Sequence, residues 1–446
     1  MDNDDENEVD PVDPVDPVEP VDPVEPVEPL EPVEPVEPGE RTILDGTAED
    51  DTLVAETRQT VNGFSGDDTI TAGQDVSETT LNVGRDDDTF IIEGTNNVAS
   101  GERGANSFGI TGTGNTANGD SGNDTFSVDG NDLTANGGAG NDTIFSGEDN
   151  SGGVLLGGFG DDEINVGGTD VLVEGDEGND LINYSAASGT AFGNLGDDTM
   201  IAEAVDRGLS GSFFGNGGND VLTVNDVPQG GGNMLLNGGD GNDRITTNVL
   251  MDTRTSDSGE DTLTGGRGDD TFNINLDFPD GTVAAGEINI ATITDFNRGT
   301  NTTNITTANN DGSGVAFDGL ELVVAEDGSY TDIIANYTSL TDGVPPTQAV
   351  IRVLDVDDLS LSDINLSTGD STTAGDDYIS SGGVLNQPAT ISGGLGDDLL
   401  LHEGRDDAGG LVMEGGIGND TLIADEIEFS NATTLDGGSG DDLLVT

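Results

Sequence analysis

The sequence lacks the residues on which much catalytic chemistry depends. Its 446 residues include no cysteine, no tryptophan and a single histidine, and all 11 basic residues are arginine. Without cysteine there can be no disulfide, thiolate zinc site or cysteine nucleophile. His402 is the only histidine, and neither an HExxH nor a GxSxG motif occurs. We therefore expect a protein that is not an enzyme.

The charge balance excludes further classes of partner. Ninety acidic residues face 11 basic ones, which gives a formal net charge of −79 at pH 7. Such a surface repels nucleic acids and anionic lipids, so we expect no nucleic-acid partner. No apolar run approaches the roughly 20 residues of a membrane-spanning helix, so we expect no membrane insertion.

Hydrophobic residues are also scarce, at 32%, and aromatic residues make up only 4%. Together with the high charge, this composition would ordinarily indicate a disordered chain. The regular spacing of the 70 glycines and of the aspartates argues against disorder beyond residue 40. Internal repeats therefore decide the interpretation of the fold.

Residues 1–40 form an acidic, proline-rich stretch. Between Asp10 and Pro38 the triplet Asp/Glu-Pro-Val recurs, and prolines fall at every third position. Polyproline II has three residues per turn and no internal hydrogen bonds. The spacing therefore predicts a disordered stalk resembling polyproline II that serves as a spacer. A ligand for a proline-binding groove is the alternative.

From residue 41 onwards the sequence repeats the pattern G-x-x-G-[ND]-D-x-apolar. Clear copies begin at Gly137, Gly157, Gly238, Gly265, Gly393, Gly415 and Gly437, and copies with one substituted glycine begin at Gly63, Gly119, Gly175, Gly193 and Gly215. The pattern resembles the GGxGxDxUx nonapeptide of the RTX, or haemolysin-type, calcium-binding proteins. This resemblance implies a right-handed parallel β-roll with two nonapeptides per turn and with calcium ions between the loops of successive turns.

The chemistry of the repeat agrees with a calcium loop. Glycine tolerates positive φ and lets carbonyl groups approach an ion. Calcium takes roughly six to eight oxygen ligands, from carboxylates and carbonyls. The aspartate at the sixth position supplies the charge. The candidate metal-binding residues are Asp68, Asp88, Asp124, Asp142, Asp162, Asp180, Asp198, Asp220, Asp243, Asp261, Asp270, Asp377, Asp398, Asp420 and Asp442, with Gly137, Gly157, Gly175, Gly193, Gly215, Gly238, Gly265, Gly393, Gly415 and Gly437.

The spacing of the sixth-position residues sets the length of a turn. The commonest step is 18 residues, so we expect an all-β solenoid of about 18 residues per turn. One loop per turn keeps the pattern and the other has lost it, which predicts two short strands per turn and two facing parallel sheets. About ten calcium ions are then expected along one edge. Because Asp270 follows Asp261 by half a turn, we expect Asp270 to face the opposite edge from Asp243 and Asp261.

Two apolar rows should fill the space between the sheets. The eighth positions read Ile70, Phe90, Phe108, Phe126, Ile144, Ile164, Ile182, Met200, Leu222, Ile245, Leu263 and Phe272. The second row reads Val61, Ala117, Ala135, Leu155, Val173, Ala191, Phe213 and Leu236. Two copies depart from the pattern, because Asn106 replaces the aspartate of its loop and Val83–Phe90 lacks the first and fourth glycines. We expect metal sites that touch these loops to be weak or empty.

The repeat divides the rest of the chain. Residues 41–272 form the main roll, and residues 273–372 lack the repeat. Alternating apolar runs in residues 273–372 predict antiparallel strands that cap the last turn, with an enzyme or ligand domain as the alternative. Within them, Ile293–Gly299 resembles a segment that often follows an RTX block. Repeats resume in residues 373–446, which predicts a second, shorter roll.

Charge and folding are linked in such a chain. Without calcium, stacked aspartates repel, and a small core cannot offset the ~1–2 kcal/mol of backbone entropy lost per ordered residue. We therefore expect folding on calcium binding. Cytosolic calcium lies far below the ~10⁻⁴–10⁻³ M of weak extracellular sites, so folding after export is expected.

The expected function is that of a secreted or cell-surface calcium-binding RTX repeat protein with a structural or interaction role. Its partner beyond calcium could be a protein or a cell-surface polysaccharide. One alternative is the non-catalytic accessory region of a secreted RTX protease, lipase or epimerase. Another is an ice- or surface-binding solenoid, which needs a flat and regular face of small polar side chains.

Overall fold

A computed structural model describes residues 41–203, 210–225, 233–250, 260–277, 286–297, 300–308, 315–325, 327–339, 347–356, 359, 364–368, 378–385, 389–395, 399–406, 411–425, 434–440 and 442–445. The expected stalk, residues 1–40, lies outside this part. The described residues form β-strands joined by turns, with no helix among them. Consequently, no helix in the described part of the chain could cross a membrane.

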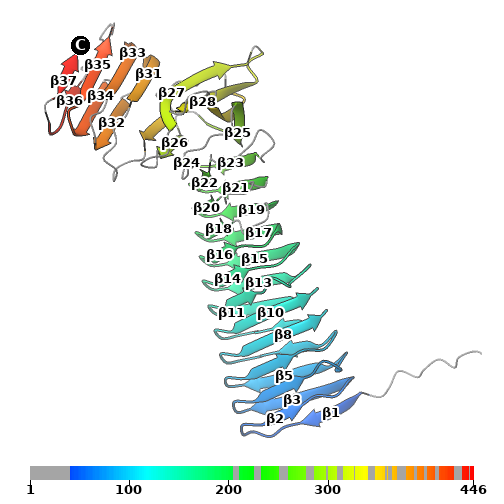
Figure 1. The fold of residues 1–446 in the computed structure, drawn as a ribbon. Coiled ribbons are helices and arrows are strands. Elements are labelled where there is room, and N and C mark those ends of the chain that lie inside the picture. Colours follow the sequence, from blue (N-terminus) through cyan, green and yellow to red (C-terminus); the bar gives the residue numbers. More distant parts are fainter. Residues whose placement is uncertain are drawn as a thin grey trace, which may run out of the picture. The chain divides into compact units, whose positions relative to one another are not determined.

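Two large sheets contain most of the strands, and the chain passes from one to the other in each turn (Figure 1). Sheet A has 16 strands, in the spatial order β1 (Thr42–Asp45), β3 (Gln59–Ser65), β5 (Thr80–Arg85), β7 (Val98–Ser100), β9 (Thr116–Asn118), β11 (Thr134–Ala139), β13 (Val154–Phe159), β15 (Val171–Glu177), β17 (Ser188–Leu195), β19 (Ser210–Gly217), β21 (Met234–Asp240), β23 (Asp261–Arg267), β25 (Gly286–Ile293), β29 (Thr347–Leu354), β28 (Tyr330–Ser339) and β27 (Val315–Val324).

Sheet B has 14 strands in sequence order. They are β2 (Thr52–Val54), β4 (Thr69–Ala72), β6 (Thr89–Ile92), β8 (Ser107–Thr113), β10 (Thr125–Asn131), β12 (Thr143–Ser146), β14 (Glu163–Val166), β16 (Leu181–Tyr184), β18 (Thr199–Glu203), β20 (Val221–Asn225), β22 (Arg244–Leu250), β24 (Thr271–Asp277), β26 (Thr302–Ala308) and β30 (Ile364–Thr368).

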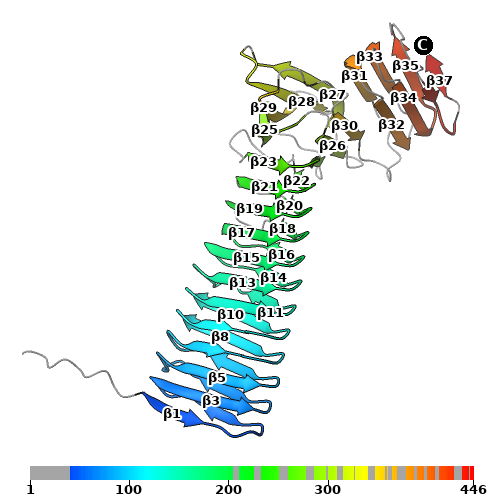
Figure 2. The ribbon, with the colours of Figure 1, turned by 180° about the vertical axis from the view of Figure 1, so that it is seen from behind.

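The register confirms the expected parallel solenoid with two strands per turn. Phe108 in β8 pairs with Phe126 in β10, and Ala117 in β9 pairs with Ala135 in β11, so both sheets repeat every 18 residues here. Seen from behind, the strands of the two sheets stack in the same order (Figure 2). Longer turns lie further along, and the turn that joins Asp243 to Asp270 spans 27 residues.

The core lies between the two sheets, where both apolar rows are buried. Phe90, Phe108 and Phe126 stack with ring centroids 4.5 Å apart, because identical side chains in register lie one strand spacing from each other. One residue was assigned to the wrong row. Leu263 lies in β23 beside Leu236, on sheet A, and Phe272 directly follows Ile245 on sheet B.

Both sheets continue past residue 272, where the repeat in the sequence ends. Strand β26 pairs in parallel with β24 and then with β30, and β25 pairs in parallel with β23 and β29. Among the described strands of this segment, the expected antiparallel pairing joins β27 to β28 and β28 to β29. The last turns of the solenoid are therefore built from sequence that has lost the glycine motif but keeps alternating apolar residues.

Two smaller parallel sheets follow. One contains β31 (Tyr378–Leu385), β33 (Leu399–Asp406), β35 (Thr421–Asp425) and β37 (Leu443–Val445), and the other contains β32 (Ala389–Leu395), β34 (Leu411–Ile417) and β36 (Thr434–Asp436). Leu400, Met413, Leu422 and Ala424 form a buried cluster between them. Their parallel register advances by 21–22 residues from one strand to the next.

Candidate metal centres

The sixth-position residues form a continuous row along the edge where the chain passes from sheet A to sheet B, which we call the aspartate edge. In each turn the backbone N–H donates to Oδ1 of the equivalent residue one turn further along, at 2.6–3.0 Å. The row consists of Asp68, Asp88, Asn106, Asp124, Asp142, Asp162, Asp180, Asp198, Asp220, Asp243 and Asp270, all buried.

A second row runs beside the first and is exposed. It contains the fifth-position residues, whose Oδ1 atoms accept from the following turn rather than from the preceding one. The N–H of Asp161 donates to Asn141 Oδ1 at 3.2 Å, and the N–H of Asn179 donates to Asp161 Oδ1 at 2.9 Å. The [ND]-D pair therefore ties each turn to both of its neighbours. Sequence reasoning identified the pair but not this role for either oxygen.

The second carboxylate oxygen of the buried row has a different environment. It is buried and has no hydrogen-bond donor in Asp68, Asp88, Asp124, Asp142, Asp162, Asp180, Asp198, Asp220, Asp243 and Asp270. A buried acceptor without a donor costs free energy, and a buried charge costs much more. A row of such oxygens therefore requires bound protons or bound cations.

The first glycine of each motif lies against this oxygen. A Cβ atom built on Gly137 would collide with Asp142 Oδ2 and with the carbonyl oxygen of Gly157 in the next turn. Gly119, Gly157 and Gly215 have the same surroundings in their own turns. We call this place, where Oδ2 and carbonyl oxygens converge beside the first glycine, the glycine notch. A notch admits no side chain and presents only oxygen acceptors.

The fourth position needs glycine for a conformational reason as well. Gly140 has a φ of +141°, and a Cβ atom there would collide with the carbonyl oxygen of Gly122 in the preceding turn. A side chain would therefore be strained and would also separate the two loops.

One turn shows what a notch accepts. In the loop of Asn106, the side-chain Nδ2 occupies the place of the aspartate Oδ2 and donates to the carbonyl oxygens of Gly101 (3.2 Å) and Gly104 (3.4 Å). The orientation of the amide is fixed because its Oδ1 accepts from the Asp88 N–H at 3.0 Å. The carbonyl groups of the first and fourth positions thus face the notch and bind an electropositive group.

Burial raises the pKa of the aspartates in the row, although the N–H bonded to each Oδ1 partly opposes this effect. The pKa rises to about 6 for Asp124 and Asp142 and to about 7 for Asp162 and Asp198. Nearby carboxylates add to the rise for Asp162 and Asp198. Near neutral pH these groups therefore hold protons more readily than exposed aspartates, unless a cation replaces the protons.

The structure corrects the placement of Asp261 and Asp270. Asp270 Oδ1 accepts from the Asp243 N–H at 3.0 Å, so Asp270 continues the aspartate edge. Asp261 lies at the other edge, where the Met234 N–H (3.1 Å) and the Thr247 hydroxyl (2.8 Å) donate to its two oxygens. The prediction that Asp261 and Asp270 lie at opposite edges was correct. However, Asp270 rather than Asp261 shares the edge of Asp243, because the turn between Asp243 and Asp270 is 27 residues long.

The last loop of the row is closed by residues outside the repeat. Asp295 accepts from the N–H groups of Gly265 (2.9 Å) and Gly266 (2.7 Å), and Asn301 Oδ1 accepts from the Asp270 N–H at 3.1 Å. Asp295 belongs to the segment Ile293–Gly299, for which the sequence predicted a capping role. The sequence analysis did not identify Asn301, because this residue lies 31 positions after Asp270 and outside any repeat motif.

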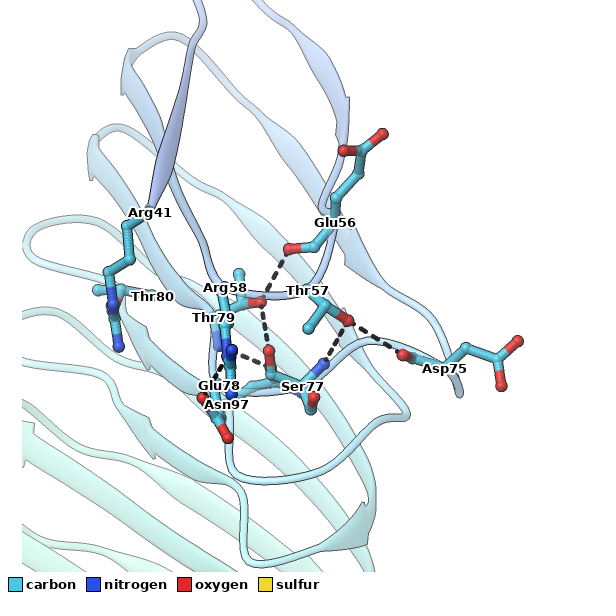
Figure 3. Close-up of polar contacts among 10 residues, drawn as sticks. All are labelled: Arg41, Glu56, Thr57, Arg58, Asp75, Ser77, Glu78, Thr79, Thr80 and Asn97. Atoms are coloured by element: carbon cyan, nitrogen blue, oxygen red, sulfur yellow. Dashed lines mark hydrogen bonds and ion pairs between the residues drawn. The ribbon is translucent and has the colours of Figure 1, made fainter. Parts of the chain in front are cut away.

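In its early turns, the opposite edge, where the chain passes from sheet B to sheet A, carries a ladder of neutral side chains. The Thr79 N–H donates to Asn97 Oδ1 at 3.0 Å, and the Asn97 N–H donates to Asn115 Oδ1 at 2.8 Å. Figure 3 shows the start of this edge, where the Thr79 hydroxyl donates to the Glu56 carbonyl and Arg58 pairs with Glu78. In these turns the edge has the same ladder geometry as the aspartate edge but carries amides and hydroxyls in place of carboxylates.

The second roll repeats the arrangement in its described part. The Asp420 N–H donates to Asp442 Oδ1 at 3.0 Å. A Cβ atom built on Gly415 would collide with Asp420 Oδ2, and one built on Gly437 would collide with Asp442 Oδ2. Gly393 lies in β32. The candidates Asp377 and Asp398 lie outside the described residues.

The donor set fits calcium better than zinc or another soft metal. No group of three histidine, cysteine or acidic side chains that could hold a metal converges among the described residues. A notch instead combines carboxylate and carbonyl oxygens, which are ligands of hard cations. Calcium accepts such irregular oxygen sets, whereas magnesium demands a near-ideal octahedron.

Comparisons with known proteins find similarity to two solved structures. No protein-family profile matches the chain, and no curated protein does. A hyperactive, Ca²⁺-dependent, β-helical antifreeze protein from an Antarctic bacterium is 17% identical, with 76% of this chain and 83% of that chain covered and a TM-score of 0.36. The AlgE6R3 subunit of the mannuronan C5-epimerase of Azotobacter vinelandii is 21% identical, with 46% and 84% covered and a TM-score of 0.16.

Proposed function

We propose that this chain is a calcium-binding repeat protein of the RTX type, whose solenoid folds when calcium enters the glycine notches. One observation carries the proposal: in nine turns of the main roll a buried carboxylate oxygen without a donor lies at a glycine notch. In the turn of Asn106, the side-chain amide supplies the missing positive end to the carbonyl groups. Calcium would supply the positive charge that the other turns lack.

Each ion would join two turns. Asp142 Oδ2 and the Gly157 carbonyl belong to successive turns and converge on the notch beside Gly137. An ion there removes the repulsion between stacked oxygens and links the loops, so binding and folding become one process. The residues that would hold the ions are the aspartates of the buried row whose loops keep the first glycine, together with carbonyl groups of the first and fourth positions.

The location and role follow from this proposal. A chain that needs millimolar calcium to fold would stay expanded in the cytosol and fold after export, at the cell surface or in the medium. A net charge of −79 would keep it soluble before and after about ten ions bind. We propose a structural or interaction role without catalysis, with an accessory region of a secreted RTX exoenzyme as the alternative.

An ice-binding role is a further alternative with a partial structural basis. Thr69, Thr89, Ser107, Thr125 and Thr143 lie in register along sheet B. The adjacent outward row reads Thr71, Ile91, Gly109, Ser127 and Phe145, which breaks the regularity in the second dimension. A measurement of thermal hysteresis tests this alternative directly.

The test of the main proposal is a calcium titration of the full chain, followed by circular dichroism and light scattering. Cooperative gain of β-structure with compaction, in calcium but not in magnesium, is the expected result. Equilibrium dialysis on the same sample counts the ions. Absence of any calcium binding in a folded chain would refute the proposal.

A further inference from the structure

Two successive turns of the aspartate edge cannot hold an ion in the way that the others do. In one turn Val83 replaces the first glycine, and its side chain is fully buried beside the row. In the next turn the glycines at 101 and 104 are present, but Asn106 replaces the aspartate. The calcium array that begins at Asp68 is therefore interrupted before Asp124.

The Asn106 notch is complete except for its charge. Asn106 Nδ2 lies 2.5 Å from the Cβ position built on Gly101, which is the place of Oδ2 in the other turns, and the Gly119 carbonyl faces the same point at 2.8 Å. Its Oδ1 keeps the ladder bond to the Asp88 N–H. The amide thus performs the two tasks that elsewhere need a carboxylate and a cation: it continues the ladder and it satisfies the carbonyl groups.

The same device occurs at the opposite edge of these turns. Asn115 Nδ2 donates to the carbonyl oxygens of Gly94 (2.8 Å) and Thr111 (2.7 Å), and Asn97 Nδ2 donates to the carbonyl of Val76 (3.2 Å). Further along the chain, buried apolar Leu133 and Val171 take the equivalent place. In the turn of residues 98–118, side-chain amides therefore hold both edges, whereas the preceding turn keeps the buried carboxylate of Asp88.

Aromatic stacking also stabilises the core in this part of the solenoid. Phe90 and Phe108 stack on each other at 4.5 Å, and Phe108 stacks on Phe126 at the same distance. Most other turns place a single aliphatic residue at this level. Aromatic stacking adds about 0.5–1.5 kcal/mol per pair beyond the burial of area.

We infer that Asn106 acts as a built-in substitute for a calcium ion, and that its turn, residues 98–118, is a calcium-independent turn from which calcium-driven folding of the following turns starts. The inference rests on the proposed function, because it states which notches calcium does not enter. It separates a single ion site at Asp68 from the array that begins at Asp124, rather than making one uniform array.

The experiment compares the full chain with Asn106→Asp. The wild-type ion count from equilibrium dialysis is the reference, and Asn106→Asp should bind one additional calcium ion. In EGTA, hydrogen exchange of wild-type amides in residues 98–118 should be at least about tenfold slower than in residues 143–200. In Asn106→Asp that difference should disappear, because a second buried carboxylate oxygen has replaced a donor. Asn123→Asp is the matched control, since it makes the same charge change at an exposed position and should alter neither readout.

A second variant keeps the inference testable if Asn106→Asp does not fold. Asn106→Ala removes the amide without creating a ligand, so it should lose the protection in EGTA and gain no ion. An unchanged ion count in a folded Asn106→Asp, or uniform exchange along the wild-type chain in EGTA, overturns the inference. A wild-type chain that binds no calcium at all would instead refute the proposed function, and the dialysis reference separates the two failures.

Discussion

Replacing one buried aspartate of the row by asparagine should change stability in opposite directions with and without calcium. Asp162→Asn is the most informative change, because Asp162 lies in the middle of the array and the loops on both sides keep the first and fourth glycines. The new amide can adopt the arrangement of Asn106. Its Oδ1 would still accept from the Asp142 N–H, and its Nδ2 would face the carbonyl groups of Gly157 and Gly160.

The magnitude follows from the two states of the notch. Without calcium, burial raises the pKa of Asp162 from 3.8 to about 7, which corresponds to a cost on the order of a few kcal/mol for the charged group in the folded state. The amide avoids this cost, so Asp162→Asn should be more stable than the wild type in EGTA at pH 7.5. With free calcium at about 100 times the dissociation constant of the site, loss of one ion removes about 2.7 kcal/mol of stabilisation.

The assay is thermal or urea unfolding of both proteins in EGTA and in calcium, with ion counting by equilibrium dialysis. Asp161→Asn is the control, because it removes the same charge one residue away at an exposed position where neighbouring turns carry Asn141 and Asn179. It should keep the ion count and change stability little in either condition. If Asp162→Asn binds as many ions as the wild type, or loses stability equally with and without calcium, the assignment of the notch as the ion site is refuted.

Four further predictions concern other parts of the molecule. In EGTA, the solenoid should melt at higher temperature at pH 5 than at pH 8, because the raised pKa of aspartates such as Asp142 makes protonation favour the folded state, and this stability is lost as the pH rises through about 6–7. Asp261→Asn should leave the ion count unchanged, since protein donors already bind both carboxylate oxygens. Phe108→Ala should lower the free energy of unfolding in calcium by about 3–5 kcal/mol, measured by urea titration. Gly140→Ala should lower the melting temperature in calcium more than Ser121→Ala does, because φ is +141° and the Gly122 carbonyl blocks the Cβ position.

Most of the fold could be predicted from the sequence because two independent sequence features repeat once per turn of the solenoid. Glycine and aspartate mark the turns, and the apolar residues two positions after each aspartate mark the strands, so the two-sheet solenoid follows from either. The prediction failed where the period changed. Asp261 and Asp270 are nine residues apart, and only the number of residues in the preceding turn decides which of them continues the row. A long turn and a missing repeat look alike in the sequence.

The continuation beyond residue 272 has a related cause. Strands β25, β26 and β30 keep parallel pairing without any glycine motif, because pairing in a solenoid depends on the exposed edge of the previous strand rather than on the turn. The residue types of the candidate site could be predicted from the sequence, but the separate roles of the two carboxylate oxygens could not. That Oδ1 serves the backbone ladder and Oδ2 faces the notch is a property of the stacked turns, which no single repeat contains.

The exchange of aspartate for asparagine in one turn explains how such a solenoid can vary its need for calcium. Oδ1 of either residue accepts the same ladder hydrogen bond, so the backbone of the turn is unchanged. The other atom decides what the notch requires: an oxygen demands a cation or a proton, and an NH₂ group demands nothing further. Under the proposed function, a difference of one amide for one carboxylate, position by position, would set how many turns depend on calcium without altering the architecture that all of them share.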